Sequence, residues 1–254
     1  MSRHRIAFVG VLALFLLGLG LISTVFDEQY MLISFALVLV AMLPFFIRFE
    51  LRGIQARELV LLALLAAIAA VSRVPFAPLP SVQPTSFVII ASALAFGAES
   101  GFLIGAIAAL VSNMFLGQGP WTPWQMFAWG MIGWTAGLLN RRGVLASRRW
   151  LLLLFGFAWG FVFGWIMNFW SVTGLVALHD WSAVAAMYAA SFYFDLAHAL
   201  SNVFFLALFA RPWLNILQRF KRKYGLLSAG GSRASSNPSS NPNPKQKPHT
   251  DSPA

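Results

Sequence analysis

Three polar side chains on the last long apolar stretch are the residues best suited to chemistry. Asp195, His198 and Asn202 follow one another at spacings of three and four, so a helix would carry them on one face. An aspartate beside a histidine can form an acid–base pair, relay a proton or bind a metal ion, but one His and one Asp do not complete a metal's ligand set. The alternative is a hydrogen-bond network that fixes helix packing, in which Asp195 and His198 neutralise each other.

Sequence motifs of the common enzyme classes are missing from the chain. It has no cysteine, which excludes disulfides, thiolate metal sites and a cysteine nucleophile. No lysine follows a glycine, so there is no phosphate-binding P-loop, and neither His-Glu-x-x-His nor Gly-x-Ser-x-Gly occurs. We therefore predict no catalytic residue, no metal site and no cofactor. Any ATP hydrolysis would have to come from another chain.

The composition places these residues in a membrane protein. Of the 254 residues, 59% are hydrophobic and 10% are charged, and the mean hydropathy is +0.72, whereas soluble domains carry about a quarter charged residues. The two shortest apolar stretches, 82–97 and 101–116, form either a helical hairpin or a re-entrant pair. The first stretch is too long for a signal peptide and is expected to be a retained helix. In all, eight membrane segments are predicted, at residues 6–26, 30–47, 58–72, 82–97, 101–116, 122–139, 150–174 and 182–210.

The charge distribution predicts the orientation. A net charge of +10 would suggest nucleic acid in a soluble protein, but membrane proteins concentrate Lys and Arg in cytoplasmic loops. If both termini are cytoplasmic, only Arg73 of the 18 basic residues falls on the outer side. We expect a multi-pass protein of the bacterial inner membrane, embedded in the lipid bilayer, with no nucleic-acid partner.

Three regions differ in composition. Residues 1–55 are predicted to be a two-helix membrane extension that ends in a basic linker. Residues 56–212 form the main membrane domain. Residues 213–254 begin with basic residues and continue as a Ser-, Asn- and Pro-rich tail, which has too little apolar surface to fold.

Small residues recur at spacing four in several apolar stretches. Such residues let helices approach closely in lipid, and for the glycines at 101, 105, 133, 137, 156, 160 and 164 we expect packing inside the bundle. The pairs Ala63/Ala67 and Ala66/Ala70 lie on a stretch made almost entirely of Leu and Ala. For these alanines, contact with a partner membrane protein is a more specific interpretation than packing inside the bundle.

Polar residues gather at the predicted outer surface. The loop 116–125 combines two glycines, two prolines, two tryptophans and two glutamines, which fits either an interfacial aromatic belt or the mouth of a ligand pocket. Arg73 is either an anchor that reaches the headgroups or a contact for an anionic or carbonyl-rich ligand. The Pro-rich stretch 74–80 and Gln83 extend the same mouth. Within the predicted segments, Asn113 and Asn168 need hydrogen-bond partners.

Residues 56–210 resemble a known family. They contain an alanine-rich first helix at 58–70, then Val-Gln-Pro-Thr at 82–85, Ala-Phe-Gly at 95–97, Val-Ser-Asn at 111–113, and the most specific string, 117–130, reading GQGPWTPWQMFAWG. This pattern is similar to the substrate-binding S component of energy-coupling factor (ECF) transporters, particularly the cobalamin-type branch. The two additional N-terminal helices depart from the family's six-helix plan.

The resemblance implies an all-α six-helix bundle with an outward-facing pocket for a vitamin-like substrate, cobalamin being the first candidate. It implies docking on an ECF transmembrane coupling subunit, driven by two cytoplasmic ATPases, through Ala63, Ala66, Ala67 and Ala70. The predicted substrate-binding residues are Arg73, Gln83, Asn113, Gln118, Trp121, Trp124, Gln125 and Asn168. Asp195, His198 and Asn202 are assigned to an intramembrane polar network.

Three other functions remain open at this point. A membrane-embedded enzyme would use Asp195 and His198, but no second carboxylate cluster or nearby nucleophile supports it. The elaborate outer loop disfavours a purely structural scaffold. A stand-alone secondary transporter would show uptake without an ATPase partner.

Overall fold

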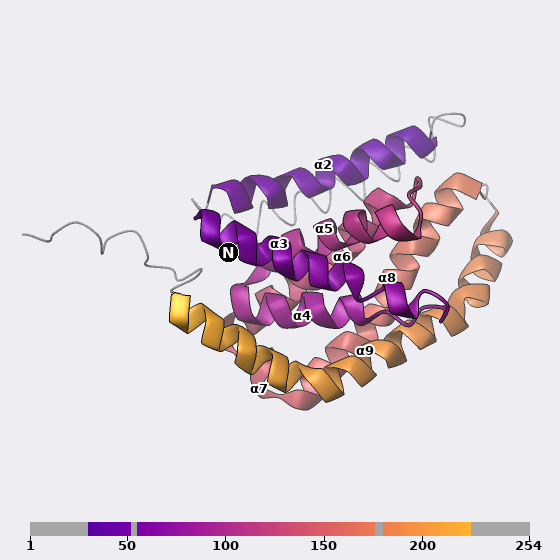
Figure 1. The fold of residues 1–254 in the computed structure, drawn as a ribbon. Helices are drawn as coiled ribbons and strands as arrows, with labels where there is room; N and C mark the ends of the chain where they lie inside the picture. Colours follow the sequence, from indigo (N-terminus) through magenta and orange to yellow (C-terminus); the bar gives the residue numbers. More distant parts are fainter. Residues whose placement is uncertain (1–29, 52–54, 176–179, 225–254) are drawn as a thin grey trace, which may run out of the picture.

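The computed structural model describes residues 30–51, 55–175 and 180–224, and within these ranges every regular element is a helix (Figure 1). The predicted all-α membrane fold is confirmed. The predicted helix at 6–26 and the tail beyond 224 lie outside the described residues. The helices are α2 (Tyr30–Glu50), α3 (Ala56–Val71), α4 (Pro84–Phe96), α5 (Ala98–Leu116), α6 (Thr122–Leu139), α7 (Val144–Ser147), α8 (Arg149–Leu175) and α9 (Trp181–Tyr224), with short 3₁₀ turns η1 (Val74–Phe76) and η2 (Asn140–Arg142).

Four segments in the described part of the chain are long and apolar enough to cross a membrane: Ala56–Phe76, Ala98–Leu116, Arg149–Val172 and Trp181–Lys223. Helix α4 has 13 residues, about 20 Å of helix, whereas the hydrocarbon core is about 30 Å thick. All of its residues are buried, and α3, α5, α6 and α9 pack around it. A short helix is tolerated here because its neighbours, and not lipid, surround it.

The C-terminal end of α4 is capped by side chains from distant elements. Asn140 donates a hydrogen bond to the carbonyl of Leu94 (3.1 Å), and the ammonium of Lys221 donates to the carbonyl of Ala95 (2.8 Å). These bonds satisfy carbonyls that have no partner inside the helix, and the positive charge of Lys221 suits a helix C-terminus.

The connection between α4 and α5 is shorter than the sequence predicts. We expected a break at residues 98–100, but these residues form the first turn of α5, and Gly97 alone separates the two helices. Gly97 has φ = 96°, which glycine adopts without steric cost. One residue therefore suffices to reverse the chain.

Glycines bring two pairs of helices into backbone contact. A Cβ atom on Gly133 of α6 would overlap the carbonyl of Gly101 of α5, and one on Gly160 of α8 would overlap the backbone of Ala199 of α9. The predicted role of the glycines in internal packing is confirmed for these pairs. The close approach fixes α5 against α6 and α8 against α9.

Helix α2 packs beside this bundle, against α5, α6 and α8 (Figure 1). The rings of Phe45 and Phe102 stack with their centroids 4.2 Å apart, and Arg48 lies 3.3 Å from the carboxylate of Glu99. The second helix of the predicted extension therefore has specific contacts with the bundle.

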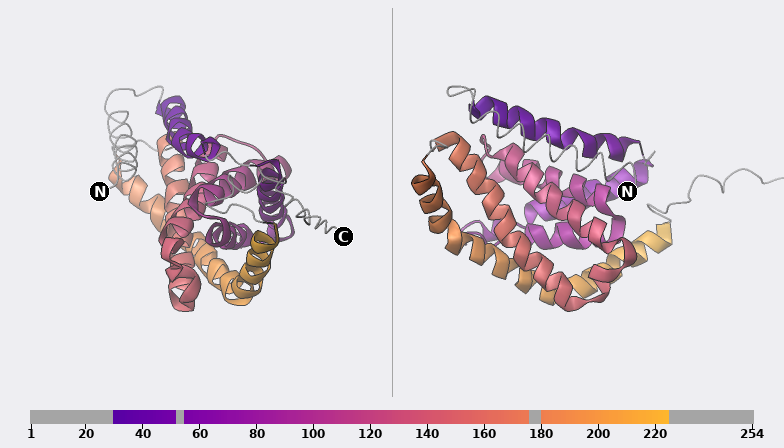
Figure 2. Two further views of the ribbon diagram at one scale, coloured as in Figure 1. Left: turned by 90° about the vertical axis from the view of Figure 1, so that its left-hand side faces the viewer. Right: turned by 180° about the vertical axis from the view of Figure 1, so that it is seen from behind.

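Helix α9 is longer than the sequence predicts. The apolar stretch ends at 210, yet α9 continues through Pro212 to Tyr224. Leu214 and Leu217 in this extension are buried against the core, and this packing offsets the one backbone hydrogen bond that Pro212 cannot donate. Figure 2 shows α9 following a curved path along one side of the bundle.

Candidate functional site

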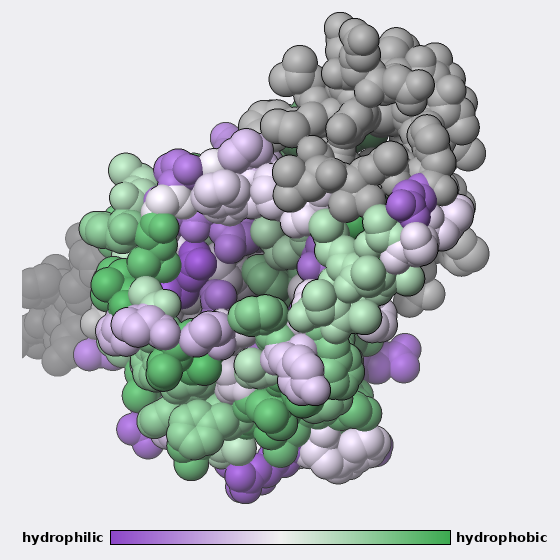
Figure 3. Space-filling view, turned by 90° about the vertical axis from the view of Figure 1, so that its right-hand side faces the viewer, coloured by the Kyte–Doolittle hydropathy of each residue, from purple (hydrophilic) through white to green (hydrophobic). Residues whose placement is uncertain are grey.

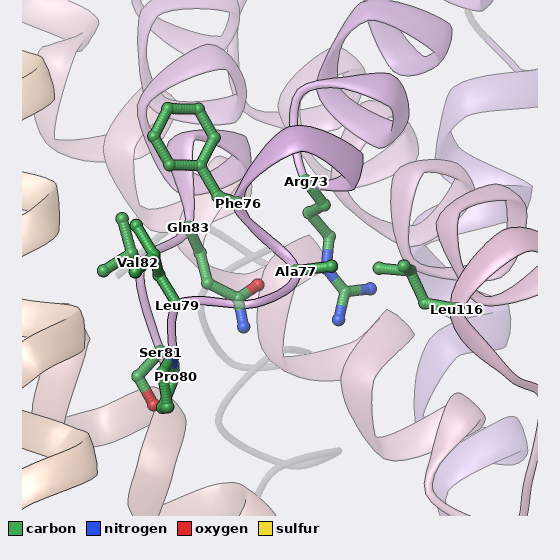
Figure 4. Close-up of a pocket in the computed structure, with 9 residues that line it drawn as sticks. All are labelled: Arg73, Phe76, Ala77, Leu79, Pro80, Ser81, Val82, Gln83 and Leu116. Atoms are coloured by element: carbon green, nitrogen blue, oxygen red, sulfur yellow. The ribbon is translucent and has the colours of Figure 1, made fainter.

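A cavity of about 240 Å³ lies beneath the connection between α3 and α4. Most of its walls come from that connection, and one residue comes from the end of α5. The lining residues are Arg73, Phe76, Ala77, Leu79, Pro80, Ser81, Val82, Gln83 and Leu116 (Figure 4). Figure 3 shows this end of the molecule, where hydrophilic residues lie in a recessed area beside hydrophobic ones.

The connection has a defined backbone. Successive hydrogen bonds join the amide of Leu79 to the carbonyl of Phe76 (2.9 Å) and the amide of Val82 to the carbonyl of Leu79 (3.2 Å). Ser81 has φ = 60°, a left-handed conformation that is uncommon outside glycine. The amide of Gln83 donates to Ser201 Oγ of α9 (3.0 Å). The Pro-rich stretch is therefore an ordered wall of the cavity.

Arg73 points into the bundle and not toward the headgroups. Its Nη1 donates to Ser112 Oγ (2.6 Å) and to Asn113 Oδ1 (3.0 Å) on α5. Its guanidinium carbon lies 4.7 Å from the ring centroid of Trp129, within the range of a cation–π contact. Of the two predicted roles, this geometry disfavours the interfacial anchor.

Asn113 links Arg73 to the start of α6. Its Nδ2 donates to Thr122 Oγ1 (3.0 Å) and to Gln125 Oε1 (2.7 Å). Thr122 in turn donates to Gln118 Oε1 (2.9 Å), and Gln118 Nε2 donates to the carbonyl of Leu110 (3.0 Å). We name this chain of bonds, from Arg73 to Gln118, the polar relay. Through Asn113, these bonds hold Arg73 in place at the cavity wall.

The two tryptophans of the predicted pocket mouth lie away from the cavity. Trp124 is 2% exposed and packs against Phe169 with ring centroids 5.7 Å apart. Trp121 makes an edge-to-face contact with Trp170 at 5.9 Å. Of the eight predicted substrate-binding residues, only Arg73 and Gln83 line the cavity.

The polar residues on α9 have separate partners. His198 Nε2 shares a hydrogen bond with Ser86 Oγ (2.9 Å), to which Trp129 Nε1 also donates (3.3 Å). Asp195 accepts from Ser191 (3.2 Å). Both residues are among those described, and no hydrogen bond joins Asp195 to His198. The predicted direct pairing of the two side chains is therefore wrong.

Two further asparagines also bond elsewhere. Asn202 Nδ2 donates to the carbonyl of Gly156 (2.9 Å), which joins α9 to α8. Asn168 of α8 donates to Ser191 Oγ of α9. Within the described residues, no group of three or more His, Cys, Asp or Glu side chains could hold a metal ion.

The four alanines on α3 divide into two pairs. Ala63 and Ala67 are exposed, whereas Ala66 and Ala70 are fully buried inside the bundle. In this structure only the Ala63/Ala67 pair is available to a partner helix.

The sequence did not single out the apolar walls of the cavity at Phe76, Val82 and Leu116. Their one signal was position, because Phe76 and Leu116 lie within the segments 74–80 and 116–125 of the predicted pocket mouth and Val82 precedes Gln83. An apolar residue in a membrane protein is otherwise indistinguishable from the many that face lipid.

A family model described as ECF-type riboflavin transporter, S component, matches residues 53–219, about two thirds of the 254 residues. No curated protein and no solved structure matches the chain.

Proposed function

This chain belongs to the ECF-type riboflavin transporter S component family, and from that premise we propose that it captures riboflavin for import across a bacterial cell membrane. Members of the family are substrate-specific transport subunits, not enzymes, and they work with ECF membrane and ATPase components. The cavity beneath the α3–α4 connection is the proposed binding site.

One observation carries the proposal: a cavity that combines apolar walls with the polar side chains of Arg73, Ser81 and Gln83. Small-molecule sites have this composition, with a few placed polar groups that fix the ligand's orientation. Arg73 supplies a positive charge that the polar relay holds in place. Gln83 supplies a carboxamide, and Figure 4 shows both side chains among the residues that line the cavity.

The size of the cavity favours riboflavin over cobalamin. Its volume of about 240 Å³ lies just below the range for small-molecule pockets, about 300–1,000 Å³. A flavin ring requires a modest opening of the connection. A corrin ring with its side chains is several times larger and requires the walls to be rebuilt.

The direct test is a titration of the purified protein with riboflavin, read by quenching of flavin fluorescence. Saturable one-to-one binding is expected, with cobalamin failing to compete. Arg73→Leu should weaken binding, whereas Arg57→Leu, at the opposite end of α3 and exposed, should not. Cobalamin binding without riboflavin binding would return the assignment to the cobalamin-type branch.

The partner surface follows from the exposure of α3. We assign the coupling-subunit contact to Ala63 and Ala67, because the small exposed side chains permit close helix approach. Riboflavin uptake should require the ECF membrane and ATPase components. Uptake that persists in cells lacking them would instead support a stand-alone secondary transporter.

A further inference from the structure

Gln83 holds a buried acceptor that no described residue satisfies. Its Oε1 atom is buried and has no hydrogen-bond partner within residues 30–51, 55–175 and 180–224, although a buried acceptor without a partner costs free energy. The residue lies in the wall of the cavity. An unpaired acceptor at that place points to a ligand that brings a donor.

The side chain of Gln83 makes no hydrogen bond to the helix that it precedes. Gln83 is the N-cap residue of α4, a position from which side chains usually bond to the first backbone amides of the helix. Here its side chain makes no capping bond. Its backbone amide is instead fixed to Ser201 Oγ at 3.0 Å, so the residue is anchored through its main chain while its Oε1 atom has no partner among the described residues.

Arg73 presents the opposite chemistry on the same cavity. A guanidinium only donates hydrogen bonds, and the described bonds of Arg73 go to the neutral oxygens of Ser112 and Asn113. A ligand that satisfies both side chains must offer a donor to Gln83 and an acceptor to Arg73. Phe76, Val82 and Leu116 supply apolar walls of the same cavity.

From these requirements we propose that Gln83 recognises the imide edge of the ligand's ring, where a ring N–H is flanked by carbonyl groups. A carboxamide pairs with such an edge by accepting from the N–H and donating to a neighbouring carbonyl. A ring carbonyl also provides the acceptor for Arg73. The inference rests on the proposed function, because the pyrimidine ring of riboflavin carries an imide of this kind.

The test compares riboflavin with its analogue methylated at the imide nitrogen, using the full-length protein and fluorescence quenching. Methylation removes the donor and adds bulk, so the wild type should bind the analogue about tenfold more weakly or worse, as expected for the loss of one buried hydrogen bond. Gln83→Met keeps the length of the side chain without its polar atoms. It should weaken riboflavin binding by a similar factor and bind the two flavins with nearly equal affinity.

Gln218→Met is the matched control, because Gln218 is exposed near the C-terminal end of α9. The same substitution there should leave the preference for riboflavin over the methylated analogue unchanged. Equal binding of both flavins by the wild type overturns the inference while leaving riboflavin as the substrate. The inference is also overturned if Gln83→Met still binds riboflavin more tightly than the methylated analogue by the wild-type factor. If the wild type binds neither flavin, the proposed substrate fails and the inference fails with it.

Discussion

Arg73 donates a 3.0 Å hydrogen bond to Asn113, and this bond joins the wall of the cavity to the start of α6. Asn113 is 2% exposed; its Oδ1 accepts from Arg73, and its Nδ2 donates to Thr122 and Gln125. The position of the guanidinium therefore depends on the way in which α5 meets α6.

Asn113→Leu should lower both the melting temperature and the affinity for riboflavin. The change leaves Gln125 and one donor of Arg73 without their partner, at about 1–3 kcal/mol for each buried group. Thermal unfolding and a flavin titration on the same sample measure the two effects. Asn215→Leu, an exposed change on α9, serves as the control, and unchanged flavin affinity in Asn113→Leu would show that the polar relay does not position Arg73.

The apolar runs were sufficient to predict the fold class and most helix positions, because hydrophobic length is read directly from sequence. Hydrogen-bond partners were not predictable in the same way. Gln118 and Gln125 were predicted to contact a substrate at a pocket mouth, yet their carboxamides bond to Thr122 and Asn113. Spacing gives the face of a helix, but packing decides which neighbour a side chain on that face reaches.

Gly133→Ala should destabilise the protein strongly. The added methyl group meets the backbone of Gly101, which cannot move without separating α5 from α6, and overpacking typically costs about 1–3 kcal/mol. Gly156→Ala is the matched variant, because there the methyl group meets only the flexible end of Leu206. Melting temperatures in detergent should fall much further for Gly133→Ala, and similar losses would contradict the described backbone contact.

Replacing Ala63 and Ala67 together with leucine should impair assembly while sparing the bundle. Both residues are exposed, so the melting temperature and flavin affinity of the isolated protein should stay near wild type, while co-purification with the ECF components falls. Ala66→Leu inserts the same bulk at a position with 0% exposure and should lower the melting temperature instead. Loss of flavin binding in the double variant would assign Ala63 and Ala67 to internal packing.

The absence of cysteine allows the proposed orientation to be tested by single-cysteine labelling. Leu79→Cys lies in the α3–α4 connection at 53% exposure, and Val144→Cys lies after the basic η2 turn at 40% exposure. A membrane-impermeant maleimide applied to intact cells should label the first and not the second. The second should become reactive once the membrane is opened, and the reverse pattern would place the cavity on the cytoplasmic side.

The separate partners of Asp195 and His198 predict nearly independent contributions to stability. Residues that share a hydrogen bond usually show interaction energies of about 0.5–3 kcal/mol in a double-mutant cycle. The pair Ser86→Ala and His198→Ala should fall in that range, because Ser86 Oγ and His198 Nε2 lie 2.9 Å apart. The pair Asp195→Asn and His198→Ala should show less than about 0.5 kcal/mol, since the carboxylate of Asp195 accepts instead from Ser191. Unfolding free energies in detergent supply both cycles, and a large coupling between Asp195 and His198 would restore the acid–base pair that the sequence first suggested.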